Sequence, residues 1–423
     1  MPQAEIAFVP SPDVSLLLNR LLDTYERRST PARIEGRQMR SIRVMLDEVG
    51  LAGYFSQVDP EPRQVANEQL QALERAGLLR LNWHPGEQGH LLEAVAMIPG
   101  SEDRLYTLVR RAPLAGLRAR LESLLLGERF RFKEDDWRLR AIQAVLRQIK
   151  EGKSPAPLSL TDVAFNEDLI AALVNLDGLD EETPFRVFSV HTFNDSKRFE
   201  EIRPALVRLA RLGQGEWKRL PEDELLREIN LVANPTYLLM SGDWSLVDGE
   251  GQALSLGEFS PSVGVPAVQA AHLQRASVRS GSVLCIENLT TFHSAAQDLV
   301  TSRSQVSALV CLAGNPSPAC RWLLRCLVDS LPEQIPLYVW ADLDYGGFNI
   351  LAQLRKQVSD RFVPYHMDIQ TLERYSQFAR PLTEGDIRNL GRLEKRTELK
   401  DVHLVLAYML QKGIKLEQEA VSF

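Results

Sequence analysis

The last third of the chain alternates short apolar runs with amphipathic stretches. Apolar residues recur at helical spacing around residues 292–300, 318–331 and 348–358. Strands that are apolar throughout and are joined by helices are typical of a parallel sheet covered on both faces. The pattern therefore predicts an α/β domain over residues 276–423. Its four expected strands read SVLCIEN, SALVCLAG, PLYVWADLD and RFVPYH.

The first 112 residues have a different pattern, in which helical stretches precede a hairpin. One helix is expected to begin near Pro62 and to end before Gly77, because proline favours the first turn of a helix and glycine the position after its end. The runs LLRLNW and LLEAVAMI, separated by HPGEQGH, predict the hairpin. Two helices followed by a hairpin are the order of a winged-helix unit, which lays a helix along DNA. A protein-docking module has the same order, so both interpretations stay open for residues 1–112.

Arginine is concentrated near the start of this region. It outnumbers the acidic residues between positions 18 and 46, in a chain whose net charge is −7. Nucleic-acid binding depends on the charge of the face presented and not on the mean charge. Arg37 and Arg40 are therefore candidate DNA contacts on a winged-helix-like region.

Residues 113–275 are predicted to hold linker helices and then a mixed α+β region that binds DNA. The stretch EGKSPAPLSL, residues 151–160, is the expected linker because its prolines and small residues cannot continue a helix. Further on, FRVFSVHTF is predicted to be a strand that leads into a turn and a helix start. A hydroxyl and two cations at such a start would suit a phosphate, and equally an N-cap with solvated charges. The candidate contacts there are Ser196, Lys197 and Arg198.

The composition is that of a globular protein without membrane-spanning helices. With 423 residues and 44% hydrophobic content, the chain is long enough for two or three globular domains. No apolar run approaches the roughly 18 to 20 residues of a membrane-spanning helix, and the N-terminal residues lack the order of a secretion signal. We therefore expect a cytoplasmic protein without a membrane partner. The cysteines have no zinc-type spacing and are expected to be small core residues: Cys285, Cys311, Cys320 and Cys326.

Acidic residues follow two of the expected strands where each strand ends. Glu287 ends the first strand, and Asp342 and Asp344 end the third. In a sheet ordered 2-1-3-4 these strands are neighbours, and their carboxyl ends meet where the strand order reverses. Residues two apart in an extended chain point to the same side, so both aspartates can face Glu287. We therefore expect three carboxylates to converge from distant segments.

Such a trio favours a divalent cation. Burying like-charged carboxylates is costly unless a cation neutralises them, and a hard ion with oxygen ligands is the natural partner. We expect Mg²⁺, with Mn²⁺ as a substitute. Gly346 and Gly347 would let the backbone turn sharply and approach a bulky anion. In the alternative interpretation, Asp342 and Asp344 only cap the next helix and Glu287 is a solvated charge.

Other polar residues leave two interpretations open. Glu417 and Glu419, in LEQEA, would reach the site from a last helix or would form the solvated face of that helix. Asp368 follows the fourth strand, where it would approach the metal or cap the next helix. Tyr54, in LAGYFSQ, is expected in the core.

These motifs resemble known families. Glu287 with Asp342-Leu343-Asp344 resembles the Toprim domain shared by topoisomerases, primases and certain nucleases. Over roughly residues 180–423, the chain more specifically resembles the nuclease subunit of the Wadjet anti-plasmid systems, the JetD or MksG family. The motifs that carry this second resemblance are FNDSKRFEEI, ANPTYLLMSG, LCIENLTTF, YVWADLDYGGFNIL and LEQEA.

The resemblance implies a dimeric, Mg²⁺-dependent endonuclease with a C-terminal Toprim domain. It also implies a central segment like the CAP domain of the type IIB topoisomerase A subunit. The implied partners are an SMC-like ATPase, a kleisin and a small winged-helix subunit, and the implied substrate is closed circular plasmid DNA. Asp342 and Asp344 would bind Mg²⁺, with Glu287 as a ligand or as the group that takes a proton from water.

Two alternatives stay open at this level. The first is a break-forming transesterase that uses a tyrosine, as topoisomerase relatives do. Tyr25, Tyr54 and Tyr237 match no such motif, so hydrolysis by activated water is expected instead. The second is a non-catalytic DNA-binding subunit of a chromosome-organising complex.

Overall fold

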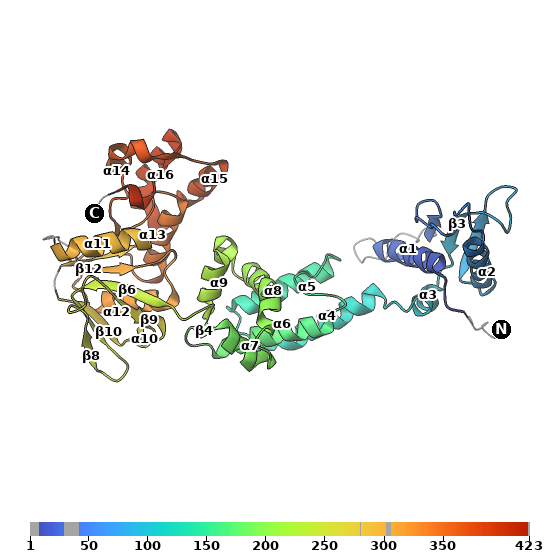
Figure 1. Cartoon of the computed structure of the whole chain (residues 1–423), viewed down its shortest axis with the longest axis horizontal. Coiled ribbons are helices and arrows are strands. Elements are labelled where there is room, and N and C mark those ends of the chain that lie inside the picture. Colours follow the sequence, from blue (N-terminus) through green and yellow to red (C-terminus); the bar gives the residue numbers. More distant parts are fainter. Residues whose placement is uncertain (1–7, 29–41, 280, 302–305, 422–423) are drawn as a thin grey trace. The chain divides into compact units, whose positions relative to one another are not determined.

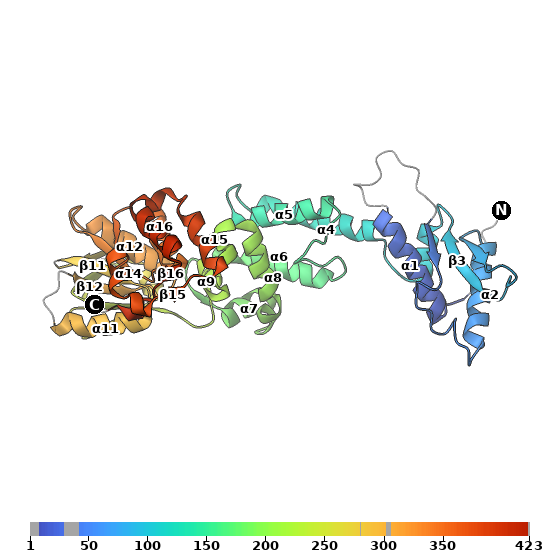
Figure 2. The ribbon, with the colours of Figure 1, turned by 90° about the horizontal axis from the view of Figure 1, so that it is seen from above.

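The chain folds into two compact units. The computed structural model describes residues 8–28, 42–279, 281–301 and 306–421. Unit 1 comprises the described parts of 1–173 with 208–218, and unit 2 comprises 174–207 with the described parts of 219–423. Figures 1 and 2 show their elements from two directions. The domain boundaries expected at residues 112/113 and 275/276 stay predictions.

The first part of unit 1 packs helices on a three-stranded antiparallel sheet of order β1-β3-β2. The helix predicted to begin near Pro62 is confirmed, because α2 begins at Glu61, and the predicted hairpin is confirmed as well. Gly77 follows the helix with a φ of +72°. Strand β1 was not predicted. Arg37 and Arg40 lie outside the described residues. The elements are α1 (Pro12–Arg28), β1 (Ile42–Met45), α2 (Glu61–Arg75), β2 (Leu79–Trp83), β3 (Leu92–Met97) and α3 (Glu102–Leu108).

Tyr54 lies in the core of this first part, as predicted. It is 1% exposed, its hydroxyl donates to Asn67 Oδ1 at 2.9 Å, and it accepts the backbone N–H of Leu92 at 2.9 Å. A tyrosine held in this way has no access to a DNA backbone.

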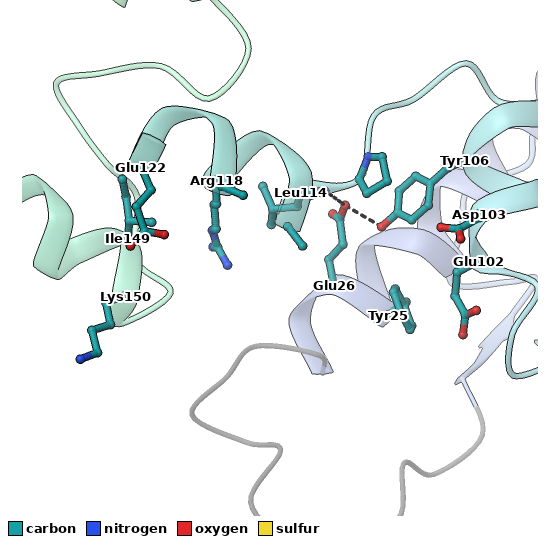
Figure 3. A pocket seen from close by; sticks show the side chains of 13 residues that line it. Tyr25, Glu26, Glu102, Asp103, Tyr106, Leu114, Arg118, Glu122, Ile149 and Lys150 are labelled. Carbon is teal, nitrogen blue, oxygen red and sulfur yellow. Dashed lines mark hydrogen bonds between the residues drawn. The ribbon is translucent and has the colours of Figure 1, made fainter. Parts of the chain in front are cut away.

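Three helices follow, namely α4 (Leu114–Glu128), α5 (Trp137–Lys150) and α6 (Val163–Asn175). Residues 151–160 are not helical, which confirms that the proline-containing stretch interrupts the helices. A cavity of about 610 Å³ lies beside the start of α4 (Figure 3). Glu26 points into it and accepts hydrogen bonds from the Tyr106 hydroxyl at 2.8 Å and the Leu114 N–H at 3.1 Å. Glu26 thus joins α1, α3 and α4.

The strand predicted for FRVFSVHTF is wrong, because residues Phe185–Phe193 form helix α7. Pro184 precedes its first turn, and Asn194 ends it in the left-handed conformation with a φ of +56°. Phe188 is buried and packs edge-on against Phe199 of α8 (Arg198–Gly213), with ring centroids 5.4 Å apart. Packing of this aromatic face overrides the strand propensity of phenylalanine and valine.

Unit 2 is built around a six-stranded sheet of order β14-β13-β11-β12-β6-β9. The four strands predicted from the apolar runs are parallel and have the predicted order 2-1-3-4. Strand β6 pairs antiparallel with β12, and β9 pairs antiparallel with β6 at the edge of the sheet. The strands are β6 (Tyr237–Gly242), β9 (Val263–Pro266), β11 (Ser282–Ile286), β12 (Val306–Cys311), β13 (Leu337–Trp340) and β14 (Phe362–Pro364).

Helices cover both faces of this sheet. Figures 1 and 2 show α11 (Leu289–Thr301) on one side and α12 (Pro318–Ser330) on the other. Strand β11 is fully buried, as expected for the centre of a parallel sheet. All four cysteines are buried and free, which confirms that they are core residues.

The remaining elements of unit 2 are further helices and small sheets. They include α9 (Glu222–Glu228), α10 (Ala267–Ala270), α13 (Tyr345–Gln357), α14 (Ile369–Arg374), α15 (Glu384–Leu393) and α16 (His403–Lys412). Two small ladders pair β4 (Thr183–Pro184) with β5 (Leu231–Val232) and β15 (Arg380–Pro381) with β16 (Ile414–Lys415). A third sheet joins β7 (Trp244–Val247), β8 (Ala253–Ser255) and β10 (Arg275–Val278). Within the described residues, no helix combines the length and apolar content needed to cross a membrane.

Candidate active site at the strand ends

Glu287 and Asp342 meet at the carboxyl ends of β11 and β13. The Glu287 N–H donates to the Trp340 carbonyl oxygen at 3.0 Å, which extends the parallel ladder one residue beyond β11. The Asp342 N–H then donates to Glu287 Oε2 at 3.0 Å. The Glu287 side chain therefore points across the strand pair to Asp342, which lies 55 positions away in the sequence.

Asp344 has a structural task at the start of α13. Its Oδ1 accepts the Gly347 N–H at 3.0 Å, so Asp344 is the N-cap residue of α13. Gly347 packs so closely on the strand end that an added Cβ would lie 2.1 Å from the Asp342 carbonyl oxygen. The start of α13 and the end of β13 therefore form one rigid corner. We call the group of Glu287, Asp342 and Asp344 around it the carboxylate corner.

The C-terminal segment completes the site. Gln418, only 1% exposed, donates its backbone N–H to Asp342 Oδ1 at 2.7 Å and its side-chain amide to the Trp340 carbonyl oxygen at 2.7 Å. Its Oε1 accepts the Asn288 N–H at 2.9 Å. Gln418 thus connects the ends of β11 and β13. Gln418 belongs to the LEQEA motif, but the residue pattern gave it no role, because its contacts are with segments that lie far away in the sequence.

Glu417 and Glu419 flank Gln418, but the helix expected for them is wrong. Residues 414–415 form strand β16, Leu416 bridges to Leu343, and residues 418–420 form a 3₁₀ turn. Backbone pairing with the end of β13 competes successfully with helix formation in this segment. Glu419 accepts the Asn288 side-chain amide at 2.6 Å, whereas Glu417 pairs with Arg380.

Burial and mutual repulsion raise the pKa values of the carboxyl groups at this corner. The pKa of Glu287 rises to about 7, mainly because the group is buried and also because Asp342, Asp344 and Glu224 carry negative charge. The pKa of Asp342 rises to about 6, again mainly through burial, although the N–H of Gln418 opposes the shift. Full ionisation of these carboxyl groups is therefore unfavourable, and either bound protons or a cation would neutralise them.

The donor set fits a hard divalent ion, although it is not a finished ligand cluster. Within the part of the chain that the structure describes, no group of three or more His, Cys, Asp or Glu side chains is arranged to hold a metal. Backbone N–H groups engage one oxygen each of Glu287, Asp342 and Asp344. Mg²⁺ commonly takes one or two carboxylates and completes its shell with water and phosphate oxygens. The carboxylates are donors of the type that Mg²⁺ prefers, but within the described residues the expected trio does not come together as a metal-binding group.

The remaining candidate residues belong to other segments of the chain, before α8 and at the start of α14. Ser196 and Lys197 are exposed in the turn before α8, where the Lys197 N–H donates to Asp195 Oδ1 at 2.8 Å. Arg198 pairs with Glu201 on the same helix. Asp368 is the N-cap residue of α14 and accepts the Thr371 N–H at 2.7 Å, which confirms the capping interpretation.

Two comparisons with known proteins bear on this fold and site. Residues 252–423 match the family described as Wadjet protein JetD, C-terminal. The chain is also 25% identical over 418 residues to the Wadjet protein JetD of Bacillus cereus (strain Q1), covering 96% of this chain and 98% of that protein. The family-model match includes Glu287, Asp342, Asp344 and Gln418.

Proposed function

We propose that this chain, which is similar to a Wadjet protein JetD over 96% of its length, belongs to that family and is the nuclease subunit of a Wadjet plasmid-defence complex. The observation that carries the proposal is the contact of Glu287 with Asp342 at the point where the strand order of a parallel sheet reverses. The proposal includes a Toprim-type fold for the C-terminal domain and a winged-helix-like N-terminal region.

The proposed reaction is hydrolysis of a DNA phosphodiester. Asp342 and Asp344 would hold Mg²⁺ or Mn²⁺, with Glu287 beside them. When bound, the ion supplies charge neutralisation at the phosphate and favours ionisation of a water molecule. Glu287, which contacts Asp342, would act as a further ligand of the ion or accept the proton of the attacking water.

The backbone around the carboxylates would orient the substrate. Asp344 and Gly347 fix the first turn of α13 against the strand end. Helix N-termini favour anions, so this turn would receive a phosphate of the DNA strand. Gln418 would keep Asp342 in place through its 2.7 Å hydrogen bond.

Double-strand cleavage needs two such sites. We therefore propose a homodimer that acts on closed circular double-stranded DNA together with an SMC-like ATPase, a kleisin and a small winged-helix subunit. Ser196, Lys197, Arg198, Arg37 and Arg40 are proposed DNA contacts outside the carboxylate corner.

Conservative variants test this function. Asp342→Asn and Asp344→Asn keep a hydrogen-bond acceptor, and asparagine is also a good N-cap residue. In the assembled complex with Mg²⁺ and supercoiled plasmid, each variant is expected to lose at least about a hundredfold in cleavage rate. Asp368→Asn, the matched cap variant on α14, is expected to cleave normally.

Undiminished cleavage by both variants would overturn the hydrolytic proposal. A protein–DNA covalent adduct at a 5′ end would instead establish a tyrosine transesterase. Absence of Mg²⁺ or Mn²⁺ binding in a calorimetric titration of the wild-type protein would favour a non-catalytic subunit.

A further inference from the structure

Helix α9 packs against the loop that follows β12, residues 312–317. Glu224 and Glu228 are four residues apart and so lie on the same face of α9. Glu224 Oε2 accepts the Asn315 side-chain amide at 2.6 Å. Glu228 forms two bonds with Arg321, at 2.7 and 2.9 Å, and both side chains are 10% exposed. The helix is thus joined to the loop at Asn315 and to the first turn of α12 at Arg321.

The same loop contacts Glu287. The Leu312 N–H donates to the Ile286 carbonyl oxygen at 2.8 Å, and the Gly314 N–H donates to the Glu287 carbonyl oxygen at 3.3 Å. A continuous set of contacts therefore runs from Glu224 through Asn315 and Gly314 to the backbone of Glu287. Glu224 lies outside residues 252–423, so the region that matches the family model does not contain it.

The loop conformation requires such anchoring. Ala313 has a φ of +52° and Gly314 a φ of +86°. Alanine is disfavoured in the left-handed region, so the surrounding contacts must hold it there. A Cβ added to Gly314 would lie 2.6 Å from Glu224 Oε1, which shows how closely the Glu224 side chain covers this turn.

We propose that Glu224 is a positioning residue for the carboxylate corner, because it holds the 312–317 loop against Glu287 through Asn315. The structural part of this inference stands on contacts alone, whereas its effect on metal binding rests on the proposed function. Glu224 acts through the loop and is not itself a ligand of the ion.

Variants of the full chain separate the effect of the Glu224–Asn315 hydrogen bond from the effect of the negative charge of Glu224. Glu224→Ala and Asn315→Ala each remove the hydrogen bond, whereas Glu224→Gln keeps an acceptor for Asn315 without the charge. The matched control is Glu222→Ala on the same helix, which removes only a partly exposed ion pair with Arg203. Two quantities are measured: hydrogen exchange of the loop amides and the affinity for Mn²⁺ by calorimetry.

Both alanine variants are expected to speed exchange of the Gly314 amide by about tenfold or more and to weaken Mn²⁺ binding about tenfold. Glu224→Gln is expected to keep the wild-type exchange rate and to lose less Mn²⁺ affinity than Glu224→Ala, because it keeps the hydrogen bond and removes only one negative charge near Glu287. Glu222→Ala is expected to behave like the wild type. The double variant Glu224→Ala/Asn315→Ala is expected to lose no more than either single variant, because both remove one shared contact.

Three results would overturn the inference. The first is a Glu224→Ala variant with unchanged exchange of the Gly314 amide and unchanged Mn²⁺ affinity. The second is a Glu224→Gln variant that loses as much protection and affinity as Glu224→Ala. The third is a double variant whose losses equal the sum of those of the single variants. If the wild-type protein binds no Mn²⁺, the proposed function fails, while the exchange data still decide whether Glu224 holds the loop.

Discussion

The backbone N–H of Asp342 donates a 3.0 Å hydrogen bond to Glu287 Oε2, which joins the ends of two neighbouring parallel strands. The donor belongs to the main chain, so the geometry of Glu287 does not depend on a bound ion. Removing the charge while keeping an acceptor at position 287 leaves this bond in place. A glutamine at this position therefore measures how much the negative charge of Glu287 changes the free energy of unfolding while the hydrogen bond is kept.

Glu287→Gln is expected to stabilise the ion-free protein at alkaline pH. The pKa of Glu287 is about 7 in the folded protein and has an ordinary value of 4.5. The folded protein therefore holds this proton more tightly than the unfolded chain does, and Glu287 lowers stability as the pH rises from about 4.5 to 7. Urea unfolding in EDTA is expected to show the variant about 1 to 3 kcal/mol more stable at pH 8 and nearly equal to the wild type below pH 4.5.

The exposed Glu258→Gln is the control for this measurement and is expected to leave the pH profile unchanged. A constant difference between Glu287→Gln and the wild type across the pH range would contradict the raised pKa.

Gly347→Ala is expected to disrupt the corner, whereas Gly346→Ala is not. A methyl group at position 347 would lie 2.1 Å from the carbonyl oxygen and 2.9 Å from the nitrogen of Asp342, so the backbone must move. At position 346 the nearest atom is Asp344 Oδ1, at 3.2 Å, in a side chain that can adjust. We expect a loss of at least about 2 kcal/mol in unfolding free energy for Gly347→Ala and less than about 1 kcal/mol for Gly346→Ala.

Equal effects of the two alanine substitutions in chemical denaturation would show that the close packing of Gly347 on the strand end is not rigid.

Glu26→Ala is expected to destabilise unit 1 more than Asp23→Ala does. Both carboxylates pair with Arg111, but the Glu26 side chain is 10% exposed and also accepts the Tyr106 hydroxyl and the Leu114 N–H. Asp23 is 46% exposed, and its ion pair is screened by solvent. We expect losses of about 2 to 3 kcal/mol for Glu26→Ala and under about 1 kcal/mol for Asp23→Ala in urea unfolding. The reverse order would contradict the role of Glu26 in joining α1 to α4.

Asp386→Asn is expected to weaken the protein at neutral pH but not in acid. Hydrogen bonds from Thr383 and the ammonium of Lys415 lower the pKa of Asp386 below its ordinary value of 3.8. Its stabilising contribution is therefore complete above that value and is lost as the pH falls through the lower pKa of the folded protein. Solvent screening limits the effect to under about 1 kcal/mol.

Unfolding free energies of the wild type and Asp386→Asn, measured between pH 2 and 7, are expected to converge at the acid end. Glu384→Gln, at a 92% exposed side chain in the same helix turn, serves as the control. A difference that persists unchanged at low pH would show that the charge of Asp386 does not contribute.

The sequence alone determined the elements whose signal is local or follows from strand topology. Apolar runs separated by helical periods specified β11 to β14, and the assumed strand order brought Glu287 beside Asp342. Proline and glycine marked the limits of α2. These features follow from hydrophobic periodicity and backbone preference, which a single stretch of chain expresses by itself.

Only the tertiary structure decided the identity of α7 and the partners of the carboxylates. Residues Phe185–Phe193 became a helix because their aromatic face packs against Phe199. Gln418 and Asn315 gained their roles from segments 76 and 91 positions away, where packing and not periodicity brings the donor to the acceptor. Such contacts depend on the whole fold, so the role of neither residue can be inferred from its own neighbourhood of the sequence.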